Sequence, residues 1–220
     1  HPALPDEPLI FIEVALTDGV SNAIGPLIDP ESEQTDPALA DCAIFYSITN
    51  CQEGLRGISF GNLLIKQVVH ELEREFPQLR TFATLSPVRG FRAWLTEVMR
   101  RNDAIAAELA SLQEARWFDQ AEAAARMQPS LMRLCAWYLT MAKREDEPLD
   151  PVARFHLGNG ARMHRLNWLA DTSKRGLQLA AGMMVNYVYR LSEVESNHEA
   201  FVHEHEIVAS HALKKLARDC

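Results

Sequence analysis

The sequence predicts an α/β (α+β) protein in which a central sheet is flanked by helices and carries a helical insertion. Two observations support this fold class. Apolar runs rich in β-branched and aromatic residues alternate with amphipathic segments over the first hundred residues. Residues 102–142 are instead rich in alanine, glutamate and leucine, which is typical of helices. For a chain of 220 residues we expect one domain, 1–220, with the insertion at about 102–142.

The first hundred residues predict three strands and two helices. The strands are expected at Leu9–Leu16, Cys42–Thr49 and about Thr81–Leu85. A helix is expected over 62–75, where apolar residues fall on one face and charged residues on the other. A further helix should begin near Phe91.

The insertion predicts three helices, at 104–115, 117–127 and 129–141, and the charged stretch 144–148 predicts a solvated linker. Asp150 followed by Pro151 is typical of a helix start, and that helix should stop at Gly158 or Gly160. The segment 161–171 is ambiguous and could be a strand. Two more helices are expected at Lys174–Tyr187 and at about Glu199–Ala217.

Composition excludes several function classes. The formal net charge of −8 argues against a nucleic-acid partner, because phosphate contacts require a basic face. No apolar run reaches the roughly 18 residues of a membrane helix, so we expect no membrane partner. The four cysteines form no C-x-x-C pair and predict free thiols of a reducing compartment. No secretory signal is visible, and the start at His1 suggests a piece of a larger protein.

The turn between the second strand and its helix is the first candidate binding site. It holds three glycines, Gly54, Gly57 and Gly61, and Arg56 stands beside them. A glycine-rich turn that opens a helix presents free backbone N–H groups to a phosphate, and the helix dipole adds its positive end. The alternative is a tight turn without a ligand. Arg56 favours the phosphate site.

Ser47 is the first candidate catalytic residue. It lies near the carboxyl end of the strand that leads into this turn, where ligands of α/β sheets collect. Its hydroxyl would lie near the reactive end of a ligand whose phosphates contact residues 56–61. The alternative is a buried serine bonded to neighbouring backbone.

His156 is the strongest candidate among the eight histidines. It stands at the end of a short helix, a position that favours the protonated imidazole and suits a proton donor. His198, His203, His205 and His211 invite a metal interpretation, but no two of them are spaced i,i+4. We therefore predict no metal site.

Several motifs resemble known families. Arg56–Gly61 (RGISFG) resembles the R-G-x-G-x-G/A pyrophosphate loop of the GCN5-related N-acetyltransferase superfamily, with Ser59 in place of the middle glycine. AIFYSIT, QEGLRGISFGNLLIK, EREFPQL with TLSPVRGF, LMRLCAWYL and DPVARFHLGNGA together resemble malonyl-CoA decarboxylase, in particular its C-terminal catalytic half. This resemblance implies an acetyltransferase-like mixed sheet.

The resemblance also implies the residues of the site. Ser47 and His156 match the catalytic serine and histidine of the family, and Tyr189 matches a tyrosine near them. Substrate and coenzyme A would be bound by residues of the phosphate loop, of the turn 19–25 and of the C-terminal half: Arg56, Gly57, Ser59, Gly61, Asn62, Gly19, Ser21, Asn22, Asn159 and Tyr189.

The implied function is a carboxy-lyase of fatty acid metabolism that converts malonyl-CoA to acetyl-CoA and CO2 without metal or prosthetic group. Coenzyme A is then part of the substrate and no cofactor is expected. The resemblance also implies an N-terminal helical domain, which these 220 residues do not include. We expect that domain to assemble the protein into a homo-oligomer. The expected location is the cytoplasm or an organelle matrix. An acyl-CoA-dependent acyltransferase and a non-catalytic acyl-CoA-binding module are the alternatives.

Overall fold

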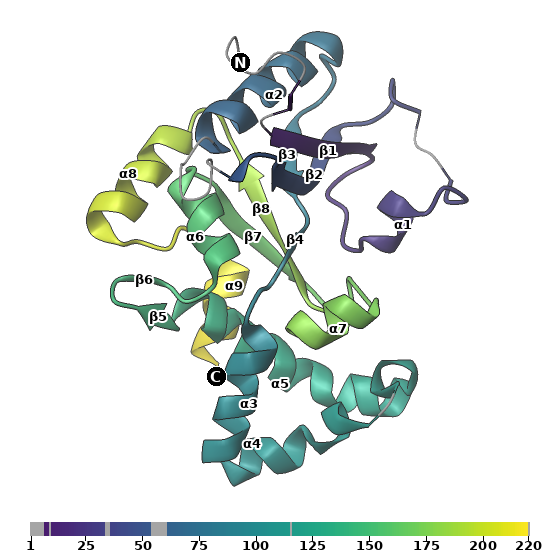
Figure 1. Cartoon of the computed structure of the whole chain (residues 1–220), viewed down its shortest axis with the longest axis vertical. Coiled ribbons are helices and arrows are strands. Elements are labelled where there is room, and N and C mark those ends of the chain that lie inside the picture. The colour runs from purple at the N-terminus through teal and green to yellow at the C-terminus, as the bar shows by residue number, and fades with distance from the viewer. Residues whose placement is uncertain (1–6, 9, 34–35, 54–60, 115, 220) are drawn as a thin grey trace.

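A computed structural model describes residues 7–8, 10–33, 36–53, 61–114 and 116–219 of the chain. Helices surround a mixed sheet with the strand order β1-β2-β3-β8-β4, in which β7 also pairs with β8 (Figure 1). Its strands are β1 (Ile10–Thr17), β2 (Cys42–Asn50), β3 (Thr81–Thr84), β4 (Ser86–Pro87), β7 (Arg162–Asn167) and β8 (Met184–Tyr189). The helices are α1 (Gly25–Ile28), α2 (Gly61–Glu75), α3 (Phe91–Arg101), α4 (Asp103–Glu108), α5 (Ala121–Thr140), α6 (Pro151–Gly158), α7 (Lys174–Ala180), α8 (Val194–Glu204) and α9 (His211–Arg218), with the 3-10 turns η2 (Ala110–Gln113) and η3 (Trp117–Asp119).

The structure confirms the three strands and two helices predicted for the first hundred residues. β1, β2 and β3 lie within a residue or so of the expected strands, and α2 and α3 follow as expected. β2 runs antiparallel to β1 and parallel to β3, so the sheet is mixed. Because β2 and β3 are parallel, their carboxyl ends lie at the same edge of the sheet.

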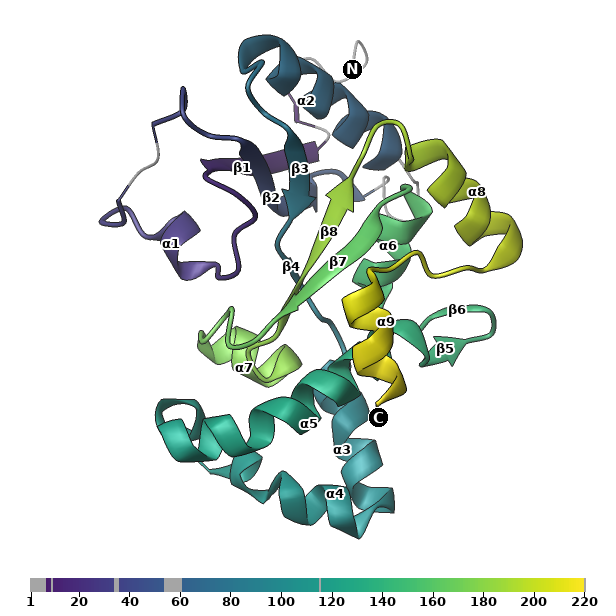
Figure 2. The ribbon, with the colours of Figure 1, turned by 180° about the vertical axis from the view of Figure 1, so that it is seen from behind.

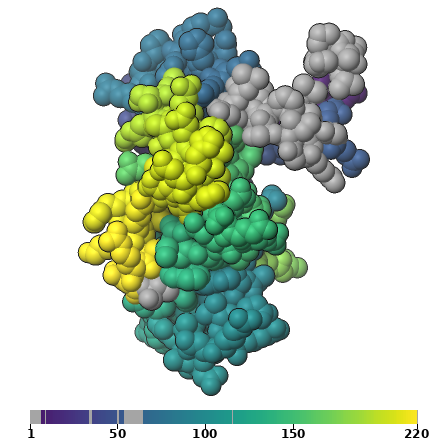
Figure 3. Space-filling model, turned by 90° about the vertical axis from the view of Figure 1, so that its left-hand side faces the viewer, coloured from purple at the N-terminus to yellow at the C-terminus, as the bar shows by residue number. Residues whose placement is uncertain are grey.

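The helical segment from α3 to α5 forms one end of the molecule, the lower end in Figures 1 and 3. The two helices expected at 117–127 and 129–141 are wrong, because α5 runs through Pro129 without a break. Met127 and Leu131 on either side of that proline are fully buried. Their burial offsets the hydrogen bond that Pro129 cannot donate.

The stretch expected to be a linker forms a small hairpin instead. β5 (Lys143–Arg144) pairs antiparallel with β6 (Glu147–Pro148), and Glu145 in the turn has a φ of 55°. Two-residue hairpin turns require such positive φ values. The charged side chains remain exposed in either arrangement, so their polarity could not distinguish a linker from a hairpin.

Two predicted helices of the C-terminal region are also wrong. The helix expected at Lys174–Tyr187 ends at Ala180, because Ala181 and Gly182 adopt φ values of 52° and 80°. The chain then turns into β8, which pairs with β3, β4 and β7. The expected helix Glu199–Ala217 is divided into α8 and α9, since His205 has a φ of 53°. The ambiguous segment contains β7.

The two faces of the sheet are covered differently. One face contributes Phe45, Phe82, Val185 and Tyr187 to the main core, together with residues of α2, α5 and α6. The opposite face packs against the segment that follows β1 through Val20, Ile24 and Leu27. Figures 1 and 2 show α6 beside β7 and β8, which brings the end of α6 to the middle of the sheet.

Candidate active site

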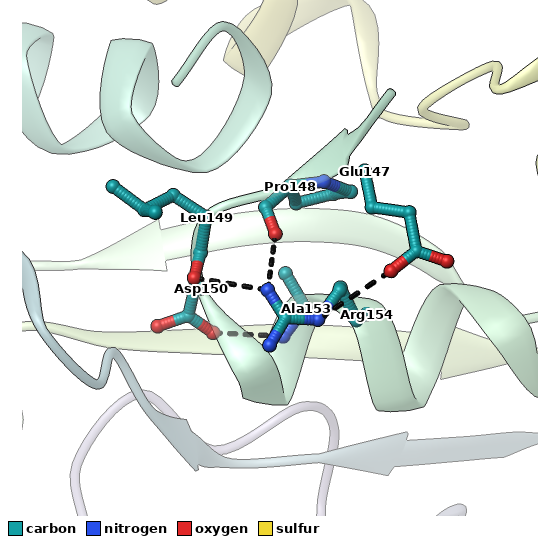
Figure 4. Close-up of polar contacts among 6 residues, drawn as sticks. All are labelled: Glu147, Pro148, Leu149, Asp150, Ala153 and Arg154. Carbon is teal, nitrogen blue, oxygen red and sulfur yellow. Dashed lines mark hydrogen bonds and ion pairs between the residues drawn. The ribbon is translucent and has the colours of Figure 1, made fainter. Parts of the chain in front are cut away.

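The helix that carries His156 is fixed firmly at its beginning. The Asp150 carboxylate caps α6 by accepting a hydrogen bond of 2.7 Å from the backbone N–H of Ala153. The Arg154 guanidinium donates to the carbonyls of Pro148 and Leu149 and contacts Glu147 (Figure 4). These contacts join α6 to the preceding hairpin, so the orientation of the helix is set before it reaches His156.

His156 lies in the last turn of α6, as predicted, and is 4% exposed. Its Nε2 is 3.0 Å from Ser86 Oγ, and its Nδ1 is 2.8 Å from the Tyr189 hydroxyl. The ring of Tyr187 stacks on the imidazole with a centroid distance of 4.4 Å. Both ring nitrogens are therefore engaged and the plane of the ring is fixed. The structure brings together His156 and Tyr189, two of the residues that the resemblance implied.

The ionisation of His156 differs from the expectation. Its place at the end of a helix predicted a protonated imidazole, but burial lowers its pKa to about 3. A helix dipole contributes less than the desolvation of a buried cation. In the absence of substrate the imidazole is therefore neutral. Burial also raises the pKa of the Tyr189 hydroxyl, which stays protonated.

Ser86 is a candidate site residue that the sequence reasoning did not name. It begins β4, which one residue separates from β3, and its side chain is buried. Its hydroxyl lies between His156 and the hydroxyl of Thr84, which is 2.9 Å away. The signal was present in TLSPVRGF, where a serine follows a strand that runs parallel to β2. That serine lies at the edge of the sheet where ligand sites are expected.

Ser47 lies elsewhere on this edge. It belongs to β2, pairs with Glu13 of β1 and is partly buried. Pairing of β2 with β3 ends at Phe45 and Thr84, two residues before Ser47. Among the described residues, Ser86 is the serine whose hydroxyl is hydrogen-bonded to His156. The catalytic role of Ser47 stays a prediction.

The predicted phosphate loop lies mostly outside the described residues, which include neither Arg56, Gly57 nor Ser59. Gly61 and Asn62 are the first residues of α2, a helix of 15 residues. A helix start at this place is compatible with a phosphate site, and phosphate binding by the loop stays a prediction.

The turn after β1 lies beside a surface hollow. Gly19 has a φ of 72°, and its N–H donates to the Asp41 carboxylate. The Ser21 carbonyl accepts a hydrogen bond of 3.0 Å from Asn186 of β8. Asn22 lines a hollow of about 280 Å³ together with Ala23, Arg165, Asn167 and Trp168.

Asn159 is buried at the end of α6. It follows the helix as its C-terminal cap, three residues after His156. Its side chain is 1% exposed, and neither amide atom has a hydrogen-bond partner among the described residues. An unpaired buried amide costs roughly 1–3 kcal/mol, which a ligand oxygen at this place would offset.

The other described histidines lie on the surface or contact backbone groups. Within the described ranges, no group of three or more histidine, cysteine, aspartate or glutamate side chains is placed to hold a metal ion. The His198 ring is bonded to the Gly158 carbonyl at 2.6 Å. None of the described helices is long and apolar enough to span a bilayer.

Comparisons with known proteins agree on one family. The sequence model of the malonyl-CoA decarboxylase C-terminal domain family matches residues 1–220. Malonyl-CoA decarboxylase, mitochondrial, of Anser anser anser is 40% identical over 236 residues, covering 96% of this chain and 47% of that protein. The chain thus spans about half the length of the curated relatives it matches.

Solved structures agree with this match. The crystal structure of malonyl-CoA decarboxylase from Rhodopseudomonas palustris has a TM-score of 0.93 and 50% identity, covering 98% of this chain and 51% of that chain. The loading GNATL domain of CurA from Lyngbya majuscula has a TM-score of 0.52 at 12% identity, covering 86% and 74%. That second likeness shows the fold, which is the acetyltransferase-like mixed sheet predicted from the sequence.

Proposed function

We propose that this chain, which belongs to the malonyl-CoA decarboxylase C-terminal domain family, is the catalytic domain of a carboxy-lyase. It converts malonyl-CoA to acetyl-CoA and CO2. Residues 1–220 act as one domain, with the helices from about 102 to 142 as an insertion. The observation that carries the proposal is the buried pair of Ser86 and His156, with the Tyr189 hydroxyl behind the imidazole.

The reaction makes modest demands on the protein. Breaking the carbon–carbon bond releases CO2 and leaves the electron pair on the thioester as an enolate, and the enolate carbon then takes a proton. The thioester carbonyl accepts the electrons, so the chemistry asks for no metal or prosthetic group. The protein must donate hydrogen bonds to the developing oxyanion and supply the proton.

The Ser86 hydroxyl suits the first task. It is buried, and its position is fixed by hydrogen bonds on both sides. A fixed donor in a site of low dielectric stabilises an oxyanion more than water does. The side-chain amide of Asn159, which has no hydrogen-bond partner among the described residues, would be a second donor.

His156 suits the second task once substrate is bound. Its neutral imidazole in the free protein is a poor acid. A malonyl carboxylate within about 4–6 Å favours the imidazolium, so bound substrate raises the pKa of His156 and lets the ring take up a proton. The imidazolium then delivers that proton to the enolate carbon and returns to the neutral form. The Tyr189 oxygen accepts a hydrogen bond from the Nδ1–H of the imidazolium and holds the ring during this transfer.

Coenzyme A binding rests on the residues that the resemblance implied. The backbone of Arg56, Gly57, Ser59, Gly61 and Asn62 would hold the pyrophosphate at the amino end of α2. The turn formed by Gly19, Ser21 and Asn22 would contact the acyl-CoA from the other side of the sheet. Malonyl-CoA is thus the proposed partner, and assembly into a homo-oligomer stays a prediction.

The function is tested by incubating the protein with malonyl-CoA, with and without an amine acceptor. We expect CO2 and acetyl-CoA in equal amounts without acceptor, at a rate that the amine does not raise. Malonyl transfer to the amine without CO2 would identify the acyltransferase. Tight binding of coenzyme A without either product would identify the non-catalytic binding module.

A further inference from the structure

Thr84 occupies the break in the sheet beside the proposed catalytic pair. β8 pairs with β3 at Ala83 and with β4 at Ser86, and the chain between these two positions leaves the regular ladder. Thr84 fills this break. Its side-chain oxygen accepts a hydrogen bond of 3.2 Å from the backbone N–H of Tyr187, and its residue is 1% exposed.

The Thr84 backbone is held as firmly as its side chain. Its carbonyl accepts a hydrogen bond of 2.8 Å from the side chain of Asn186, which is fully buried. Asn186 in turn accepts from Asn167 at 2.8 Å and donates to the Ser21 carbonyl. Thr84 therefore has little freedom to move, and its hydroxyl is a fixed point for any group bonded to it.

The Thr84 hydroxyl is bonded to the side chain of Ser86 at 2.9 Å. The Tyr187 N–H can only donate, so it always takes one acceptor position of the Thr84 oxygen. Three proton arrangements remain. Ser86 donates to Thr84 and accepts from His156, or Thr84 donates to Ser86 and Ser86 donates to His156, or Ser86 accepts from both and keeps its own proton for a substrate oxygen. The third arrangement is the one that an oxyanion donor requires, and in it the hydrogen bond from the Thr84 hydroxyl fixes the direction of the Ser86 hydroxyl.

We propose that Thr84 is a positioning residue that acts through Ser86. It restricts the Ser86 side chain to the rotamer that reaches both His156 and the substrate oxygen. This role rests on the proposed function, in which Ser86 stabilises the enolate. The hydrogen bonds of the Thr84 side chain among the described residues go to Ser86 and to the backbone N–H of Tyr187.

Thr84→Val tests the role, because valine keeps the shape and removes the hydroxyl. We expect kcat for CO2 release to fall about fivefold to tenfold, the effect of one lost hydrogen bond, with KM within twofold of the parent. Thr84→Ser keeps the hydroxyl and should keep kcat within twofold of the parent. Equal losses in Thr84→Val and Thr84→Ser would contradict the role.

A double-mutant cycle separates positioning from support of the fold. In a Ser86→Ala background, adding Thr84→Val should change kcat less than twofold, because the group that Thr84 positions is gone. The same loss of kcat in both backgrounds would overturn the proposal. If Thr84→Val does not fold, Thr84→Cys replaces it in the cycle, since its thiol has a similar size and bonds more weakly.

A readout without turnover keeps this test separate from that of the proposed function. If the parent releases no CO2, the proposed function fails. The ¹⁵N chemical shifts of the His156 ring still report the hydrogen bond between Ser86 and the ring. They should change in Thr84→Val and stay at the parent values in Thr84→Ser. Unchanged shifts in both variants would overturn the role of Thr84.

Discussion

His156→Asn is expected to lower kcat for CO2 release from malonyl-CoA by about two to four orders of magnitude, the range for loss of a positioned acid. Asparagine has a similar size and can still bond Ser86, so binding of coenzyme A should stay within about threefold of the parent. The measurement is steady-state CO2 release with purified, folded protein. A parent-like kcat in this variant would remove His156 from the mechanism.

The pH profile of kcat distinguishes a proton donor from a structural histidine. If bound substrate converts His156 to the imidazolium, parent kcat should decline as pH rises through the pKa of this group in the complex. The residual activity of His156→Asn, with water as the proton source, should lack this decline. A replaced structural histidine would instead lower stability and leave turnover per folded molecule unchanged.

The second large effect concerns stability in acid. The pKa of His156 is lowered from 6.5 to about 3, so below pH 6.5 the unfolded chain binds a proton that the folded protein does not. The free energy of unfolding should therefore fall by up to about 1.4 kcal/mol for each pH unit between 6.5 and 3. His156→Asn should lack this contribution.

Denaturant unfolding of both proteins from pH 7 to pH 4 measures the difference. Burial raises the pKa of Asp150 from 3.8 to about 6, which opposes the loss between those values because the folded protein then binds the extra proton. Asp150 is present in the parent and in the variant, so its effect cancels in the comparison. Parallel pH curves for the two proteins would show that His156 is not buried as a neutral ring.

The sequence predicts β1, β2 and β3 because these strands are locally distinctive. β1, β2 and β3 are short apolar runs between turn residues, and the helix start at Asp150 and Pro151 is a capping signal. β8 was missed because 174–187 contains small and long-chain residues common in helices. Positive φ values at Ala181 and Gly182, which end α7, depend on tertiary packing and leave little local signal.

The site was predicted in part for the same reason. His156 and Tyr189 could be named from their motifs, and the structure places them 2.8 Å apart. Ser86 and Ser47 are both serines near the carboxyl ends of parallel strands, so their positions in the sequence are nearly equivalent. Which of them faces His156 depends on where β8 exchanges β3 for β4, and that exchange is a tertiary feature.

The most direct test of the central claim is the rate of CO2 release from malonyl-CoA by Ser86→Ala, with Ser47→Ala as the matched control. We expect Ser86→Ala to fold and bind coenzyme A while kcat falls roughly 100- to 1,000-fold, the loss measured for one oxyanion donor in other enzymes. Ser47→Ala should lose less than tenfold. Parent-like turnover in Ser86→Ala, with the large loss in Ser47→Ala instead, would contradict this account and support the catalytic role that the resemblance implied for Ser47.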